Sequence, residues 1–216
     1  MRCGRNVGDT RDPRLQRAID SIALPGTLVD HRVIAPGDEL ALLPDEFGAF
    51  ATSVVKVRRA SGAARIIARE LFERLGHAAR AIPKSTAGMP IWPEGLVGSL
   101  AHDSEIAIAA LASRHDFLSL GVDVEPAEPL DRELLEIVAT ATERQQMQED
   151  RFDGRLLFAV KEAVYKAIYP IDRAYLDHHD VEVSLKSGTA QVRNGRSVKF
   201  KYGVASHIVA LAFVPA

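Results

Sequence analysis

The chain has 216 residues, enough for one large domain or two small ones, and its 47% apolar and 26% charged residues are typical of a folded protein with a core. A formal net charge of −2 argues against a general nucleic-acid binder. The single cysteine, Cys3, excludes an internal disulfide and a cysteine zinc site, so we expect a cytoplasmic protein. No apolar run reaches the roughly 20 residues that a membrane-spanning helix needs.

The first half of the chain alternates helical and strand patterns. Residues 1–24 hold only a short amphipathic stretch, whereas the apolar spacing farther along is regular enough to assign elements. A long helix is expected to end at Gly76, because glycine is a common helix stop. In order, we expect a strand at 27–35, a short helix at 42–50, the long helix at 53–76, a Gly/Pro loop at 84–95 and two strands within 96–113 joined by a turn near 102–104.

The second half predicts an α+β arrangement. The tail alternates apolar and polar residues between the turn signals Ser187-Gly188 and Asn194-Gly195, which is typical of a β-meander. Helix and strand patterns are mixed similarly in both halves, so we expect two subdomains, 1–117 and 118–216. In order, we expect a strand at 117–126, one helix over 130–148, another over 154–169 and the meander over 181–214.

The strand sequence "GVDVEP" places Asp123 and Glu125 two residues apart. Side chains alternate along a strand, so both carboxylates share one face while Val122 and Val124 face the core. Two neighbouring carboxylates repel unless a cation lies between them, and hard oxygen ligands suit Mg²⁺. The alternative is a solvated strand end that happens to carry two acids.

The helix sequence "LLFAVKEAVYKAIYP" carries charges on an otherwise apolar helix. Glu162 and Lys166 are four residues apart and share a face. They could form an ordinary helix-stabilising pair. Alternatively, Glu162 joins Asp123 and Glu125 as a third carboxylate, and Lys161 and Lys166 neutralise phosphate groups, which together would make a metal–phosphate site.

Positive charge also gathers on the long helix of the first half. Arg58, Arg65 and Arg69 fall along one stripe, and guanidinium groups match the geometry of phosphates. A solvated helix face is the alternative, as for most charge runs. Lys84, next to the Gly/Pro loop, and His102, in a turn after Ser99, are further candidates for phosphate contacts. The candidate phosphate-binding residues are therefore Arg58, Arg65, Arg69, Lys84, Ser99 and His102.

Three blocks of this sequence together resemble the 4′-phosphopantetheinyl transferase family, in its enterobactin-synthetase-component-D and surfactin-type branch. The blocks are "WPEGLVGSLAH", "GVDVE" and "FAVKEAVYK", in this order, within a resemblance that covers roughly residues 53–185. They match the family patterns W-P-x-G-x-x-G-S-x-x-H, G-[IV]-D-x-E and [WF]-x-x-K-E-A-x-x-K. Where the family has an arginine-rich helix, this chain has Arg58 and Arg59, and either arginine could be the contact.

The resemblance implies a fold of two similar α/β subdomains about a pseudo-twofold axis, with coenzyme A in the cleft between them. It implies transfer of the 4′-phosphopantetheine arm to a serine of an apo acyl or peptidyl carrier protein, with release of 3′,5′-ADP, by a monomeric enzyme. Mg²⁺, or Mn²⁺, would be bound by Asp123, Glu125 and Glu162. Coenzyme A would be held by residues of both halves: Arg58, Arg65, Lys84, Ser99, His102, Asp123, Lys161 and Lys166.

Glu162 has two possible roles under this resemblance. It can bind the metal, which we rank first, and it can act as the general base for the carrier serine, while Lys166 stabilises charge on the pyrophosphate. Two other functions use the same residues: a Mg²⁺-dependent phosphohydrolase with water as the nucleophile, and a coenzyme A-binding module with structural acids.

Overall fold

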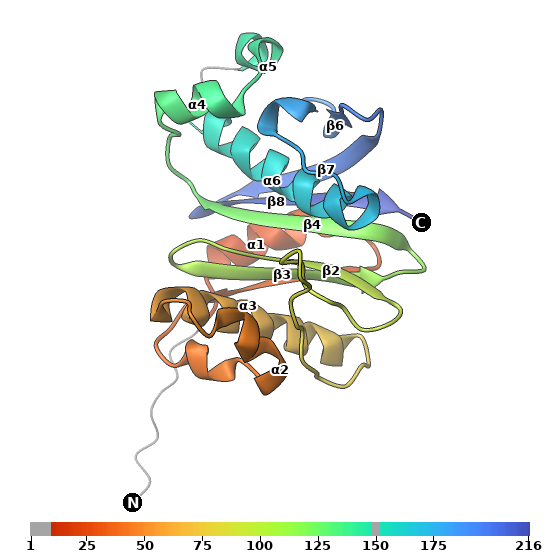
Figure 1. The fold of residues 1–216 in the computed structure, drawn as a ribbon. Helices are drawn as coiled ribbons and strands as arrows, with labels where there is room; N and C mark the ends of the chain where they lie inside the picture. The colour runs from red at the N-terminus through yellow and green to blue at the C-terminus, as the bar shows by residue number, and fades with distance from the viewer. Residues whose placement is uncertain (1–9, 148–151) are drawn as a thin grey trace, which may run out of the picture.

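The protein consists of two antiparallel β-sheets stacked on one another, each covered on its outer face by a long helix (Figure 1). The computed structural model describes residues 10–147 and 152–216. This architecture confirms the predicted α+β class. Cys3, the single cysteine of the sequence, lies outside the described residues. None of the helices in the described part is both long and apolar enough to cross a membrane.

The N-terminal half is a three-stranded sheet in the order β1-β3-β2, with helix α3 on its outer face. Asp12 caps the first helix by accepting hydrogen bonds from the backbone N–H groups of Arg14 and Leu15. The elements are α1 (Pro13–Ile22), β1 (Thr27–Val33), η1 (Asp38–Ala41), α2 (Pro44–Phe47), η2 (Gly48–Phe50), α3 (Val55–Arg74), β2 (Leu96–His102) and β3 (Ile106–Ser113).

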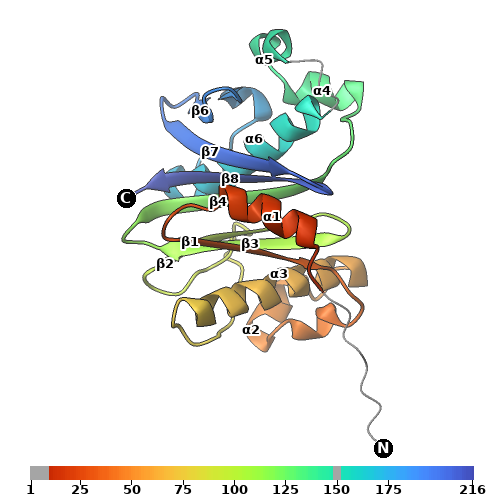
Figure 2. The ribbon, with the colours of Figure 1, turned by 180° about the vertical axis from the view of Figure 1, so that it is seen from behind.

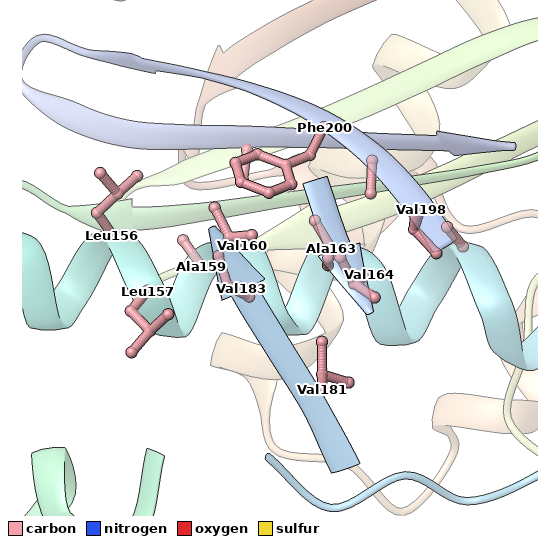
Figure 3. Packing of buried hydrophobic residues seen from close by; sticks show 14 of the residues in the cluster. Leu156, Leu157, Ala159, Val160, Ala163, Val164, Val181, Val183, Val198 and Phe200 are labelled. Carbon is pink, nitrogen blue, oxygen red and sulfur yellow. The ribbon is translucent and has the colours of Figure 1, made fainter. Parts of the chain in front are cut away.

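The C-terminal half is a five-stranded sheet in the order β4-β8-β7-β6-β5, with helix α6 on its outer face. Figure 3 shows Val160, Ala163 and Val164 of α6 packed toward Val198 and Phe200 of the sheet. The elements are β4 (Phe117–Pro126), α4 (Arg132–Val138), α5 (Ala141–Gln146), α6 (Asp153–Asp172), η3 (His178–Asp180), β5 (Val181–Ser184), β6 (Thr189–Val192), β7 (Ser197–Val204) and β8 (His207–Pro215).

The single helix predicted over 130–148 is wrong: the described part of this segment forms α4 and α5. Ala139 is extended, and Thr140 starts a new helix by accepting a hydrogen bond from the backbone N–H of Glu143. The Glu143 carboxylate in turn accepts one from the backbone N–H of Thr140, which completes a capping box. The apolar periodicity runs across this break, whereas the Thr140 capping pattern marks the start of the second helix.

A continuous apolar layer lies between the two sheets. Leu15 and Ile19 of α1 insert there, against residues of β1, β2 and β3 on one side and of β4 and β8 on the other. Figure 2 shows α1 between the two sheets on the side opposite to the view of Figure 1. The chain passes from one sheet to the other between Ser113 and Phe117, yet both halves share this layer.

Strand β4 and helix α6 are in direct backbone contact at Gly121. A side-chain carbon at this position would overlap the backbone carbonyl of Ala163, so only glycine allows this approach. Val122 and Val124 point into the layer between the sheets, as the alternation of "GVDVEP" predicted. The opposite face of β4, which carries Asp123, is therefore pressed against α6.

The two halves are also joined by an ion pair between two turns. Asp103, between β2 and β3, accepts from His207 Nε2 at 3.0 Å, and Ser206 donates to the Asp12 carboxylate at 2.6 Å. Burial alone would lower the pKa of His207, but the contact with Asp103 outweighs it, so the pKa of His207 is raised. Burial alone would raise the pKa of Asp103, but the hydrogen bond from His207 and those from the backbone outweigh it, so the pKa of Asp103 is lowered.

We expect this ion pair to stabilise the fold in a pH window. His207 contributes fully below its unfolded pKa of about 6.5 and loses its contribution as pH rises through the higher folded pKa. Asp103 contributes above about pH 4 and loses its contribution as pH falls through its lower folded pKa. Asp103→Asn keeps the Oδ1 that accepts from the backbone N–H groups of Glu105 and Ile106. It should therefore lower the free energy of unfolding by on the order of 1 kcal/mol near pH 6 and by less above pH 8.

Urea unfolding at several pH values measures this cost. The control is Asp116→Asn, because Asp116 pairs with His115 on the surface, where both side chains are well exposed. A cost for Asp103→Asn that does not change between about pH 6 and pH 9 would show that the charge of His207 does not contribute.

Candidate active site

Asp123 is a buried carboxylate on β4 that faces helix α6. Lys166 Nζ donates to its Oδ1 at 2.6 Å, while its Oδ2 is buried without a hydrogen-bond partner among the described residues. Burial, together with the charge of Glu162, raises the pKa of Asp123 to about 6 in spite of the Lys166 ammonium. An acceptor buried without a partner costs free energy, so this oxygen suits a cation from outside the chain.

Glu125 lies two residues farther along β4 on the same face. Its Oε2 accepts a hydrogen bond from Arg155 Nη1 of α6 at 3.1 Å. Burial and the negative charge of Asp123 raise the pKa of Glu125, while the guanidinium of Arg155 opposes the rise. The two carboxylates therefore influence each other electrostatically, as their spacing in the sequence predicted.

Glu162 is the third carboxylate, contributed by the middle of α6. Its Oε1 lies 3.4 Å from Nε2 of His178 in η3. The contact with His178 lowers the pKa of Glu162 against the effect of burial, and the charge of Lys166, one turn along the helix, lowers it too. Because Glu162 also raises the pKa of Asp123, the strand and the helix bring their acids into one electrostatic site.

The donor set fits a hard divalent cation such as Mg²⁺. It consists of carboxylate oxygens, one of them buried and unpartnered on Asp123. Each acid is meanwhile held by a cationic side chain or a histidine: Lys166, Arg155 or His178. Within residues 10–147 and 152–216, no three His, Cys, Asp or Glu side chains already converge as a metal cluster. The pairing of Lys166 with Asp123 would therefore have to open when a cation enters.

Lys161 requires a correction, because the sequence suggested a phosphate contact for it. Its side chain is buried, and Nζ donates to Glu143 Oε2 at 2.7 Å and to the carbonyl oxygens of Val138 and His178, both at 2.8 Å. All three hydrogen atoms of this ammonium are used inside the C-terminal half.

A cavity of about 500 Å³ opens between the two halves; Lys166, the partner of Asp123, lines it, whereas the three acids themselves do not. Lys166 reaches it from α6 and Ser99 from β2. Arg114 and Arg173 also line the cavity, together with apolar and aromatic residues such as Trp92, Tyr165 and Tyr169. Residues of both halves thus form one cleft with cationic side chains in its walls.

Lys84 and His102 add positive charge from the N-terminal half. Burial lowers the pKa of His102, and the charges of Lys166 and Lys84 lower it further, which indicates that the three groups share one region. Lys84 Nζ lies 4.3 Å from the centre of the Phe50 ring, and burial lowers its pKa. The structure therefore groups three of the predicted phosphate contacts.

The arginines of α3 are largely turned toward the protein. Arg65 is buried: its guanidinium donates to the carbonyl oxygens of Ile82 and Ser61 and lies 3.5 Å from Glu46. A direct phosphate contact of Arg65, which the stripe suggested, is not available in this arrangement, because internal acceptors surround the group. Arg58 donates to the carbonyl oxygen of Ser53, whereas Arg59 pairs with Glu39 and Arg69 with Glu46.

Three residues around this site were not predicted from the sequence: Glu143, Arg155 and His178. Arg155 and Glu143 could have been found, since Arg155 lies on the acid-bearing helix and Glu143 follows a Thr-x-x-Glu capping pattern. His178 follows an irregular segment after α6, so no periodicity connects it with Glu162. Only the folded chain shows that contact.

Two segments of the chain match family descriptions that share one name. Residues 45–112 match the 4′-phosphopantetheinyl transferase N-terminal domain, and residues 119–212 match the 4′-phosphopantetheinyl transferase superfamily. Together these segments hold both walls of the cleft, with β2 in the first and Asp123 and α6 in the second.

Similar proteins carry the same name. The 4′-phosphopantetheinyl transferase Npt of Nocardia iowensis is 35% identical over 177 residues, 80% of this chain and 80% of the relative. Svp of Streptomyces mobaraensis is 35% identical over 70% of this chain and 64% of its own length. PptT of Mycobacterium tuberculosis is 33% identical over 76% of each chain.

We expect Lys161→Met to destabilise the protein strongly. The substitution leaves the buried carboxylate of Glu143 without its cation, and breaking a buried ion pair in this way costs roughly 3–5 kcal/mol. Adding Glu143→Gln should recover part of the loss, because the remaining group is then neutral. Urea unfolding measures both effects, with the exposed Lys186→Met as the control. A Lys161→Met protein as stable as wild type would restore the phosphate-binding interpretation.

Proposed function

This chain belongs to the 4′-phosphopantetheinyl transferase superfamily, and we propose that the cleft between its two halves is where transfer takes place. It transfers the 4′-phosphopantetheine arm of coenzyme A to carrier proteins. The observation that carries the proposed site is Asp123: a buried carboxylate with one unpartnered oxygen, whose other oxygen is held by a lysine that lines the cleft. Both walls come from one chain, which supports action as a monomer with subdomains 1–117 and 118–216.

Coenzyme A is proposed to bind in the 500 Å³ cavity with its phosphates toward the positive groups. Lys84 and His102 would hold the adenosine 3′-phosphate, with Ser99 and Arg58 nearby. Lys166 would bind the pyrophosphate, which requires its ammonium to leave Asp123 and turn into the cavity that it already lines. The charge that Lys166 now neutralises on Asp123 would then have to be matched by another cation.

Asp123, Glu125 and Glu162 would hold Mg²⁺ or Mn²⁺, which supplies Lewis-acid neutralisation of the pyrophosphate when bound. The departure of Lys166 from Asp123 leaves both carboxylate oxygens free for this role. Arg155, by contrast, would stay on Glu125 and keep that carboxylate oriented toward α6. Ligand contacts of Lys166 and Asp123 would thus replace the internal ion pair between them.

The reaction needs a nucleophile and a proton acceptor. The nucleophile is the serine hydroxyl of the carrier protein; its oxygen forms a bond to the phosphorus attached to pantetheine, and the bond from that phosphorus to the 3′,5′-ADP oxygen breaks. Glu162 would take the serine proton, directly or through water, while Lys166 stabilises the charge on the leaving group. Positioning and charge neutralisation are the main contributions expected from the protein.

We expect Glu162→Gln to abolish transfer and leave the fold intact. The amide keeps the shape of the side chain but neither accepts the serine proton nor carries the charge for a cation. The measurement is the mass gain of roughly 340 Da on an apo-carrier protein incubated with coenzyme A and Mg²⁺. The matched control is Glu133→Gln on the exposed face of α4.

Transfer by Glu162→Gln within about tenfold of wild type, a barrier change near 1.4 kcal/mol, would show that Glu162 has neither role. Coenzyme A cleaved by the wild-type protein without any mass gain on several carriers would indicate the hydrolase instead.

We expect Lys84→Met to raise the KM for coenzyme A about tenfold, which corresponds to one lost charged contact of about 1.4 kcal/mol. The effect should be much smaller with 3′-dephospho-coenzyme A, because that substrate lacks the phosphate that Lys84 is proposed to hold. Steady-state kinetics with both substrates measures the difference, and the exposed Lys199→Met is the control. Equal loss with both substrates would place Lys84 in a structural role.

A further inference from the structure

Three side chains of α6 meet at a single residue, His178 of η3. The Phe158 ring stacks on the imidazole with centroids 5.5 Å apart and planes inclined by 23°. Lys161 Nζ donates to the backbone carbonyl of His178 at 2.8 Å, and Glu162 Oε1 lies 3.4 Å from its Nε2. Residues 158, 161 and 162 are spaced by three and four positions, so α6 presents them to the same neighbour.

The turn that carries His178 is itself held in place. Asp177 accepts a hydrogen bond from the backbone N–H of His179 and so caps the turn. Lys161, which holds the His178 carbonyl, is fixed by Glu143, and Glu143 accepts from the backbone N–H of Val183 in the adjoining strand. The ring position of His178 is therefore set by the C-terminal fold.

The imidazole nitrogen that faces Glu162 has no other use that the structure describes. Nε2 is buried and makes no hydrogen bond among the described residues, and the ring borders a small cavity of about 90 Å³ together with Glu162, Tyr165 and Tyr175. A buried polar atom without a partner lowers the stability of the fold, which suggests that this nitrogen has a functional role. Its separation of 3.4 Å from Glu162 Oε1 shortens to a hydrogen bond with a small side-chain adjustment.

We propose that His178 is a positioning residue that holds Oε1 of Glu162 and leaves the other carboxylate oxygen for the cation and the carrier serine. The inference rests on the role proposed for Glu162. A carboxylate at the end of a flexible glutamate side chain would otherwise sample several rotamers, and a fixed partner reduces that freedom. His178 acts through Glu162 and does not itself touch the substrates.

The test separates the ring nitrogen from the ring packing. His178→Phe keeps an aromatic ring to stack on Phe158 and removes the nitrogen, whereas His178→Gln places an amide N–H near the position of Nε2. The matched control is His179→Phe, which changes the exposed neighbouring histidine of the same turn. The full-length enzyme is measured for kcat, for the KM of coenzyme A, for thermal unfolding and for Mn²⁺ affinity by electron paramagnetic resonance.

We expect His178→Phe to lower kcat about tenfold and weaken Mn²⁺ binding about fivefold, with the KM of coenzyme A changed by less than about twofold. His178→Gln should recover most of both losses, and His179→Phe should match wild type. If His178→Phe does not fold, His178→Ala and His178→Gln give the same contrast, because only glutamine offers an N–H.

Two outcomes would overturn the inference. One is a His178→Phe enzyme with wild-type kcat and Mn²⁺ affinity; the other is an equal loss in the Phe and Gln variants that follows the loss of thermal stability. A failure of this inference is distinct from a failure of the proposed site, because Glu162→Gln then still abolishes transfer. Transfer retained by Glu162→Gln would instead reject the site, and the positioning role with it.

Discussion

The site depends on the contact between β4 and α6 at Gly121. Because no side chain separates this strand from the carbonyl of Ala163, the two elements approach closely enough for their polar groups to meet. Asp123, two residues along the strand, is thereby buried against Lys166, one turn along the helix from Glu162. Neither element alone has a site: the strand contributes two acids, and the helix contributes the third together with the cations.

Charge balance explains how such an acidic group is tolerated in the free protein. The three acids are each matched by a different side chain, and the fourth pair, Lys161 with Glu143, is structural rather than functional. The difference lies in burial and in the number of acceptors. Lys161 is surrounded by internal oxygens, whereas the half-exposed Lys166 borders the cleft and can exchange its partner. Two lysines five residues apart on one helix thus lie in different surroundings, one enclosed by internal acceptors and the other at the cleft.

Much of the fold and part of the site could be predicted from local sequence. Strand alternation correctly placed Val122 and Val124 in the core and Asp123 on the opposite face, because the period of two is a property of the strand itself. Periodicity failed at 130–148, where the Thr140 cap ended one helix pattern and began another. It also could not orient Lys161 or Arg65. Apart from Ser61, four residues before Arg65, their partners lie 17 to 23 residues away in segments of unrelated pattern. His178 required the tertiary fold for the same reason.

The apolar layer shared by the two sheets has a mechanical consequence. Opening the halves like a hinge would expose Leu15, Ile19 and their neighbours to water, at a cost that grows with the apolar area uncovered. This packing therefore opposes a hinge motion that would widen the cleft, and substrates of different bulk would have to be accommodated at its rim. The loop after Lys84 lines the cleft, with a bridge between Lys84 and Pro90 and a contact from Arg173 of the other half to Met89. Adjustment to different substrates would then fall to this loop and not to the packed sheets.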